Sequence, residues 1–159
     1  QVIANNGESL GVKTTRSAEG LVLTKMESAK HLEWNFTDCP DLAQTVLPVC
    51  AAKGITGAFT GLESLRIKET DRISALQNEL AKIGAALTGR EGSHWALTPA
   101  AVPLNRQGTV KIQTYHDHRM AMGFAPWATQ TPLDIEDREV VNKSYPGFWE
   151  DMKAVGFTL

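Results

Sequence analysis

Two short runs of charged residues carry most of the chemistry that this sequence can support. They are Lys68-Glu69-Thr70-Asp71-Arg72 and His116-Asp117-His118-Arg119, and each is predicted to lie in the first turn of a helix. A helix N-terminus favours anions, so Arg72 and Arg119 occupy unfavourable positions. Lys68 and Arg72 are four residues apart and would place two like charges on one helix face. The pattern predicts a bound anion, such as a phosphate or a carboxylate, at both runs.

The overall composition sets broad limits on function. Lys and Arg number 16 against 18 Asp and Glu in 159 residues, so no general basic field favours nucleic acid or a membrane as a partner. Cys39 and Cys50 are the only cysteines and lack the spacing of a zinc site, which favours a reducing cytoplasm. The chain begins at Gln1 without a methionine, which predicts a processed or truncated protein.

The elements that must position these charges repeat along the chain. Gly11, Gly84 and Gly156 recur at intervals of 73 and 72 residues. The first two each precede a predicted β-hairpin, over 12–24 and 85–98, in which short apolar strands flank a polar loop. Phe157-Thr158-Leu159 is predicted to begin a third strand after Gly156.

Helices and short strands fit between the hairpins. Two helices lack a clean polar face and are predicted to be buried, over 40–54 and 120–128, although Pro48 and Pro126 should kink or shorten them. Two others are amphipathic, over 73–83 and 148–155, and short strands are predicted at 55–59 and 133–135. The repeat predicts an α/β fold of stacked units with helices inside and sheets outside.

These patterns resemble one known family. The sequence is similar to the C-terminal part of 5-enolpyruvylshikimate-3-phosphate (EPSP) synthases. The stretches that carry the resemblance are Pro40-Asp41-Leu42-Ala43, Arg66 to Arg72, Tyr115-His116-Asp117-His118-Arg119-Met120-Ala121-Met122, and Asn142-Lys143-Ser144-Tyr145-Pro146. Their order and spacing agree with the family over most of the chain beyond residue 35.

The resemblance implies a fold and a domain organisation. The family has two domains of inside-out βαβαββ units, with the active site in the cleft between them. It implies that this chain starts within one unit (about 1–35), continues through a full unit (about 36–98) and holds most of another (about 108–159). The N-terminal domain, which supplies further phosphate ligands in the family, is expected to be absent, so the fragment alone should be inactive.

The resemblance also implies a reaction. The enolpyruvyl group of phosphoenolpyruvate is transferred to the 5-hydroxyl of shikimate 3-phosphate in the pathway to chorismate and aromatic amino acids. Asp41 matches the proton acceptor at the 5-hydroxyl, Glu69 a candidate proton donor, and Lys68 a lysine between the shikimate phosphate and the reacting centre. General acid–base groups and preorganised cations supply most of such catalysis. No metal or organic cofactor is implied.

The remaining matched residues bind or support the substrates. Arg72 and Arg119 match two arginines that clamp the phosphoenolpyruvate carboxylate, and Lys143 matches a lysine near the departing phosphate. Ser64 stands where many relatives place an asparagine on the shikimate phosphate. Asp117 and His118 are expected to support the site. The ordinary alternative for Arg72 is an ion pair within its own run, with Glu69 three residues earlier.

Three other functions compete with this one. The first is the related transferase that acts on UDP-N-acetylglucosamine, whose motifs match less well. The second is a metal site at His116, Asp117 and His118, which a helix disfavours because residues two apart point away from each other. The third is a non-catalytic fragment that binds anions weakly.

Overall fold

The computed structural model describes residues 7–68, 70–90, 93–101 and 108–159. The strands are β1 (Val12–Ser17), β2 (Gly20–Lys25), β3 (His31–Asn35), β4 (Thr56–Thr60), β5 (Ala86–Arg90), β6 (His94–Thr98), β7 (Val110–Ile112) and β8 (Leu133–Ile135). The α-helices are α2 (Ala43–Lys53), α3 (Arg72–Lys82), α4 (His118–Phe124) and α5 (Phe148–Ala154). Four 3-10 helices join them, η1 (Pro40–Leu42), η2 (Glu63–Ile67), η3 (Ala125–Thr129) and η4 (Arg138–Lys143).

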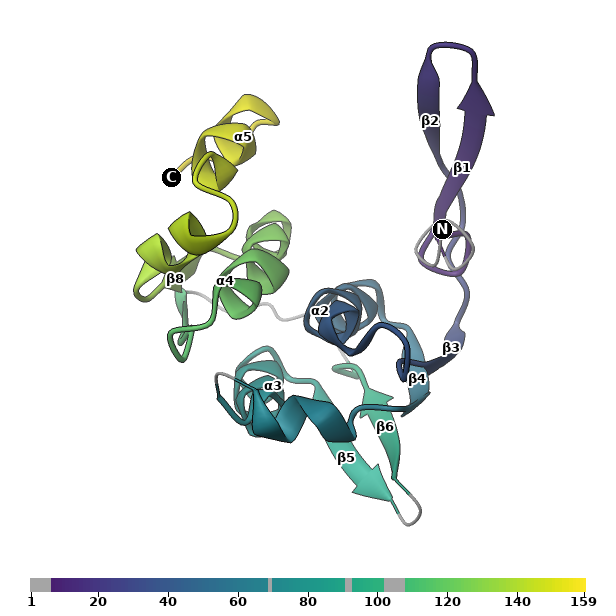
Figure 1. Ribbon diagram of the computed structural model, residues 1–159, viewed down its shortest axis with the longest axis vertical. Coiled ribbons are helices and arrows are strands. Elements are labelled where there is room, and N and C mark those ends of the chain that lie inside the picture. The colour runs from purple at the N-terminus through teal and green to yellow at the C-terminus, as the bar shows by residue number, and fades with distance from the viewer. Residues whose placement is uncertain (1–6, 69, 91–92, 102–107) are drawn as a thin grey trace.

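A four-stranded sheet forms the largest layer of the fold. Its strand order is β3-β4-β6-β5, with β3 parallel to β4 and the hairpin β5–β6 antiparallel to β4. Leu32, Trp34 and Phe59 alternate with exposed residues along β3 and β4, so one face of the sheet is apolar. Helices α2 and α3 cover that face, which places helices inside and the sheet outside, as predicted (Figure 1).

Helices α2 and α4 pack closely at the centre of the molecule (Figure 1). Pro48 has no N–H for the carbonyl of Gln44, and Gly123 of α4 lies against this carbonyl. A Cβ atom on Gly123 would lie only 2.0 Å from the Gln44 oxygen, so the contact requires glycine. The Pro48 carbonyl accepts a 2.7 Å hydrogen bond from the Trp127 indole. Helix α2 continues through Pro48 to Lys53, so Pro48 does not shorten it, whereas α4 ends at Phe124, shortly before Pro126.

Both predicted hairpins and the short strand at Leu133–Ile135 are confirmed. The hairpin β1–β2 projects from the rest of the molecule (Figure 1), and nearly all of its residues are exposed. Strands β3 and β7 were not predicted. Strand β7 pairs in parallel with β8 in a separate two-stranded sheet. None of the helices in the part of the chain that the structure describes is long and apolar enough to cross a membrane.

Candidate active site

Both charged runs lead into helices whose first residue follows an aspartate cap. Asp71 accepts hydrogen bonds of 3.1 Å from the backbone N–H groups of Ile73 and Ser74, and Asp117 accepts one of 2.8 Å from Arg119. Each aspartate thus occupies the N-terminal position where a carboxylate is favourable. Arg72 and Arg119, the first and second residues of α3 and α4, each have a carboxylate nearby. This accounts for cations at helix starts without a bound anion.

The prediction that all of Lys68 to Arg72 lies in a first helical turn is wrong. Helix α3 begins only at Arg72, and Lys68 follows η2 in an extended conformation. Lys68 and Arg72 therefore do not stack on one helix face. Glu69, the expected proton donor, lies outside the described residues.

The carboxylate of Asp41 lies among three cations. Its Oδ1 atom is 2.7 Å from Nη1 of Arg72 and 3.9 Å from Nζ of Lys68, and its Oδ2 atom is 3.1 Å from Nη2 of Arg119. Pro40 favours the start of η1, which carries Asp41, and the Asp41 side chain is 36% exposed. The fold therefore joins an acid from η1 to bases that follow η2 or begin α3 and α4.

Arg72 is the buried centre of this cluster. Its side chain is only 2% exposed, and its Nε atom donates a 2.6 Å hydrogen bond to Oδ2 of Asp117, which is fully buried. Gln44 of α2 contributes a longer hydrogen bond of 3.4 Å to the same oxygen. Arg72 thus binds both Asp41 and Asp117, while the alternative pairing with Glu69 lies outside the described residues. A buried guanidinium held by two carboxylates fixes the starts of α3 and α4 relative to each other.

Arg119 is placed differently from Arg72, because its side chain is 35% exposed. Its Nε atom is nevertheless buried and has no hydrogen-bond acceptor among the described residues. An unsatisfied buried donor costs free energy and calls for an explanation. Among the residues that the structure describes, Lys68, Arg72 and Arg119 face the two carboxylates of Asp41 and Asp117, so cations outnumber carboxylates there. The arrangement is suited to an anion that reaches Arg119 and Lys68 from solvent.

In the ranges that the structure describes, three other predicted residues make no ion pair with Asp41 or the two arginines. His118 is 15% exposed, and its Nδ1 atom lies 4.0 Å from Oδ1 of Asp117. Ser64 is exposed on η2, one turn before Lys68. Lys143 is exposed at the end of η4, which packs against α4. Within the described ranges, no hydrogen bond or ion pair joins Ser64 or Lys143 to Asp41 or the two arginines.

The alternative of a metal site finds no support in the side-chain positions. His116 is 91% exposed and lies 2.8 Å from Asp137, whereas His118 lies near Asp117. No group of three or more His, Cys, Asp or Glu side chains in the described part of the chain could hold a metal ion.

Comparison with known proteins shows which family the chain belongs to. The family model described as EPSP synthase (3-phosphoshikimate 1-carboxyvinyltransferase) matches residues 1–152. The chain belongs to the EPSP synthase family. A 3-phosphoshikimate 1-carboxyvinyltransferase of Bacteroides fragilis is 44% identical over 152 residues, which are 94% of this chain and 37% of the relative. One of Methanospirillum hungatei is 34% identical over 150 residues, or 92% of this chain and 34% of the relative.

The fold of EPSP synthase is also found in a solved structure. The EPSP synthase of Acinetobacter baumannii superposes with a TM-score of 0.66 at 22% identity, over 95% of this chain and 38% of that chain. The predicted enolpyruvyl transferase fold is thereby confirmed. The chain spans little more than a third of the length of these EPSP synthase relatives.

Sequence reasoning missed a buried polar network that joins α3 to the segment before α4. Glu79 of α3 is fully buried and accepts hydrogen bonds from Nζ of Lys82 (2.6 Å), the N–H of Gln113 (3.0 Å) and the hydroxyl of Tyr115 (2.9 Å). Its position seven residues after Arg72, on the same helix face, was a signal that could have identified it. A pocket of about 490 Å³ lies beside this network, lined by Thr70, Gln113 to His116, Glu136 and Asp137.

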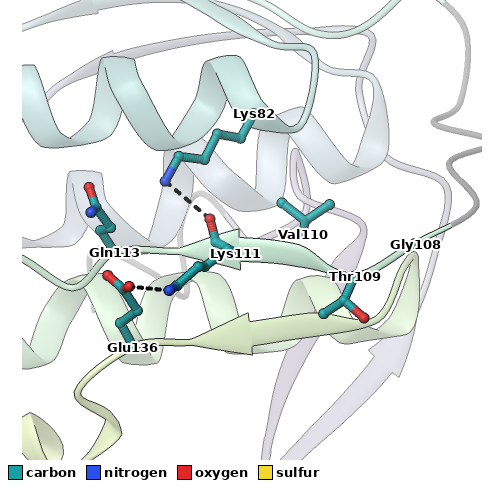
Figure 2. Close-up of a pocket in the computed structure, with 7 residues that line it drawn as sticks. All are labelled: Lys82, Gly108, Thr109, Val110, Lys111, Gln113 and Glu136. Carbon is teal, nitrogen blue, oxygen red and sulfur yellow. Dashed lines mark hydrogen bonds and ion pairs between the residues drawn. The ribbon is translucent and has the colours of Figure 1, made fainter.

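A second pocket lies away from the predicted residues. Figure 2 shows this open pocket of about 660 Å³ between the end of α3 and strand β7. None of the residues proposed from the sequence lines it. Its charged side chains are already paired, because Lys111 lies 2.6 Å from Glu136 and Lys82 donates to the Lys111 carbonyl.

Proposed function

We propose that this chain forms one wall of the active site of an enzyme that transfers the carboxyvinyl group of phosphoenolpyruvate to the 5-hydroxyl of shikimate 3-phosphate. Membership of the EPSP synthase family supports this reaction class. The observation that carries the proposal is the Asp41 carboxylate held beside Lys68, Arg72 and Arg119, because it combines a proton acceptor with cations for anionic substrates.

The proposed reaction assigns a proton transfer to each acid. Protonation of C3 of phosphoenolpyruvate, by Glu69 in this proposal, makes C2 electrophilic. The 5-oxygen of shikimate 3-phosphate then bonds to C2 while Asp41 accepts its proton. Cleavage of the bond between C2 and the phosphate oxygen, with loss of a proton from C3, releases phosphate and restores the double bond. No metal or organic cofactor takes part in this scheme.

The proposed binding roles follow the exposure of the cations. Arg119 meets the phosphoenolpyruvate carboxylate directly, with its unsatisfied Nε atom available as a further donor. Arg72 takes part when the substrate carboxylate replaces Asp41 at its Nη1 atom. Lys143 is assigned to the departing phosphate, Lys68 and Ser64 to the shikimate phosphate, and Asp117 and His118 to orienting the arginines.

A second domain is part of the proposal. The chain spans 37% of the length of the Bacteroides fragilis relative, which supports a facing wall built by other residues of the full-length protein. We propose units at about 1–35, 36–98 and 108–159, with the start of the middle unit extended to include β3, because β3 pairs with β4. We also propose a cytoplasmic location, which the free thiols of Cys39 and Cys50 support.

The test is an assay of phosphate release. We expect the full-length protein to release phosphate from phosphoenolpyruvate only when shikimate 3-phosphate is present, and the isolated chain 1–159 to show negligible turnover. UDP-N-acetylglucosamine replaces shikimate 3-phosphate in the matched control. Release that does not depend on shikimate 3-phosphate, or that prefers the UDP sugar, would overturn the proposed function.

We expect Arg119→Ala in the full-length enzyme to raise the KM for phosphoenolpyruvate about 30-fold, as a charge-assisted hydrogen bond of about 2 kcal/mol is lost. Arg138→Ala is the matched control, because Arg138 is an exposed arginine on η4 that pairs only weakly with Glu139, at 3.7 Å. Steady-state kinetics at saturating shikimate 3-phosphate measure both variants. Equal KM values in the two variants would remove Arg119 from the carboxylate site.

A further inference from the structure

The segment before α4 holds an unfavourable backbone conformation. Tyr115 and His116 are consecutive non-glycine residues with φ values of 54° and 58°. Non-glycine L-residues rarely adopt this left-handed backbone region. Two such residues in succession persist only when the surrounding contacts enforce them. The two residues immediately precede Asp117, which caps α4 and holds Arg72. The conformation of this turn therefore decides where Asp117 and Arg119 lie.

Two residues on one face of helix α3 bind this segment. At its first residue, Arg72 binds Asp117 at 2.6 Å. Two helical turns later, Glu79 accepts hydrogen bonds from the N–H of Gln113 and the hydroxyl of Tyr115, at 3.0 and 2.9 Å. Of the two left-handed residues, Tyr115 is itself bound to Glu79 and His116 lies between the two attachments, so Glu79 fixes the end of the segment that Arg72 does not hold.

The Glu79 carboxylate is itself held rigidly. It is fully buried, and Lys82 donates to it at 2.6 Å while also donating to the Lys111 carbonyl of β7 at 3.1 Å. Figure 2 shows Lys82 reaching from α3 to this carbonyl. Burial raises the pKa of Tyr115, as does the charge of Glu79, although the hydrogen bond from Asn78 acts in the opposite direction. The Tyr115 hydroxyl therefore keeps its proton and remains a donor at neutral pH.

We infer that Glu79 is a positioning residue, which through Tyr115 holds the turn at 113–117 in the conformation that sets Asp117 and Arg119 in the active site. This inference rests on the proposed function for its kinetic consequences. Glu79 does not touch the cluster around Asp41. Its effect should therefore fall on the groups that bind phosphoenolpyruvate through α4, and not on Lys68 or Ser64, which precede α3.

The experiment uses Tyr115→Phe, Glu79→Gln and Glu79→Ala in the full-length enzyme. Loss of one hydrogen bond to a buried charge should raise the KM for phosphoenolpyruvate about tenfold in Tyr115→Phe and more in Glu79→Ala. Glu79→Gln keeps an acceptor oxygen, so it should raise the KM for phosphoenolpyruvate less than Glu79→Ala does. The KM for shikimate 3-phosphate should change less than about twofold in each.

Gln77→Ala is the matched control. It removes a 2.9 Å hydrogen bond from α3 to the Leu87 carbonyl of β5, and so weakens the same helix without touching the turn. We expect the control to leave both KM values unchanged. A KM for phosphoenolpyruvate that is unchanged in Tyr115→Phe and Glu79→Ala, or raised equally in Gln77→Ala, would overturn the inference. Tyr115→Phe keeps the aromatic ring, so the test stands if Glu79→Ala does not fold.

Amide hydrogen exchange separates this inference from the proposed function. Exchange of the Asp117 and Arg119 amides, which bond to the Thr114 carbonyl and the Asp117 carboxylate, should accelerate in Tyr115→Phe but not in Gln77→Ala. This readout needs no substrate. Absence of turnover in the wild type would refute the proposed function while exchange still tests the role of Glu79. Unchanged exchange at both amides in Tyr115→Phe would refute the positioning role.

Discussion

Asp41→Asn in the full-length enzyme should lower kcat about 10²- to 10⁴-fold, which is the contribution typical of a general base. The substitution preserves the shape of the side chain and one acceptor oxygen, but it removes the group that takes the proton from the 5-hydroxyl. The wild-type carboxylate is 36% exposed, so substrate can reach it.

The effect on substrate binding distinguishes catalysis from structure. Asp41 partly neutralises Lys68, Arg72 and Arg119. Removing its charge makes the cluster more positive, so the KM for phosphoenolpyruvate should stay the same or fall while kcat collapses. If Asp41 only held the cations in place, its loss would instead raise the KM for phosphoenolpyruvate.

Steady-state phosphate release and direct titration with phosphoenolpyruvate measure the two quantities separately. Asp38→Asn serves as the control, because Asp38 is an exposed acid on the segment that leads into η1. A kcat for Asp41→Asn within about twofold of the control would show that another group accepts the proton.

Local signals account for the parts of the fold that the sequence predicted. Pro40 and Gly54 bound the segment of η1 and α2, and the left-handed Gly54 ends it as expected. The stripe Ile73, Leu76 and Leu80 marked the buried face of α3. Strands β7 and β8 have only three residues each, too few for an alternating pattern to be recognised. Strand β8 was predicted from its place between a buried and an amphipathic helix, and β7 has no such place.

The sequence predicted which residues make up the candidate site better than it predicted their contacts. Family motifs brought Asp41, Lys68, Arg72 and Arg119 together, and the structure confirms that they are neighbours. Two partners of Arg72, Asp41 and Asp117, lie 31 and 45 residues away in sequence, and a rule based on helical spacing could not suggest them. The spacing of Glu79 from Arg72 could have placed it on the same face of α3, but its donors Gln113 and Tyr115 lie far along the chain and could not be predicted from that spacing.

Substitution of the two aspartates that cap α3 and α4 should have large and unequal effects on stability. Asp117→Ala should lower the free energy of unfolding by about 3–5 kcal/mol, because it breaks a buried ion pair with Arg72 and removes the cap of α4. Asp71→Ala removes the corresponding cap of α3, but its ion pair with Arg66 at 3.2 Å is exposed on both sides. The cost of Asp71→Ala should be about 1 kcal/mol.

The comparison isolates the buried pair because both aspartates occupy the same helical position. Partial burial would raise the pKa of Asp71, but hydrogen bonds from Ser74 and Ile73 and the charge of Arg66 hold it below its usual value. The Asp71 cap therefore stabilises the fold at neutral pH and loses its effect only as pH falls through that lowered pKa. Measurements at pH 7 therefore record the full contribution of the Asp71 cap.

Urea denaturation of the full-length variants gives the loss of stability. Because large proteins of several domains need not unfold in one step, hydrogen exchange of peptides that span α3 and α4 assigns the loss to this part of the chain. Equal losses for Asp117→Ala and Asp71→Ala would mean that Asp117 acts only as a cap. A larger loss for Asp117→Ala, with faster exchange in both helices, would mean that the pair between Arg72 and Asp117 holds the starts of α3 and α4 together, since that contact joins the cap of α4 to a side chain of α3.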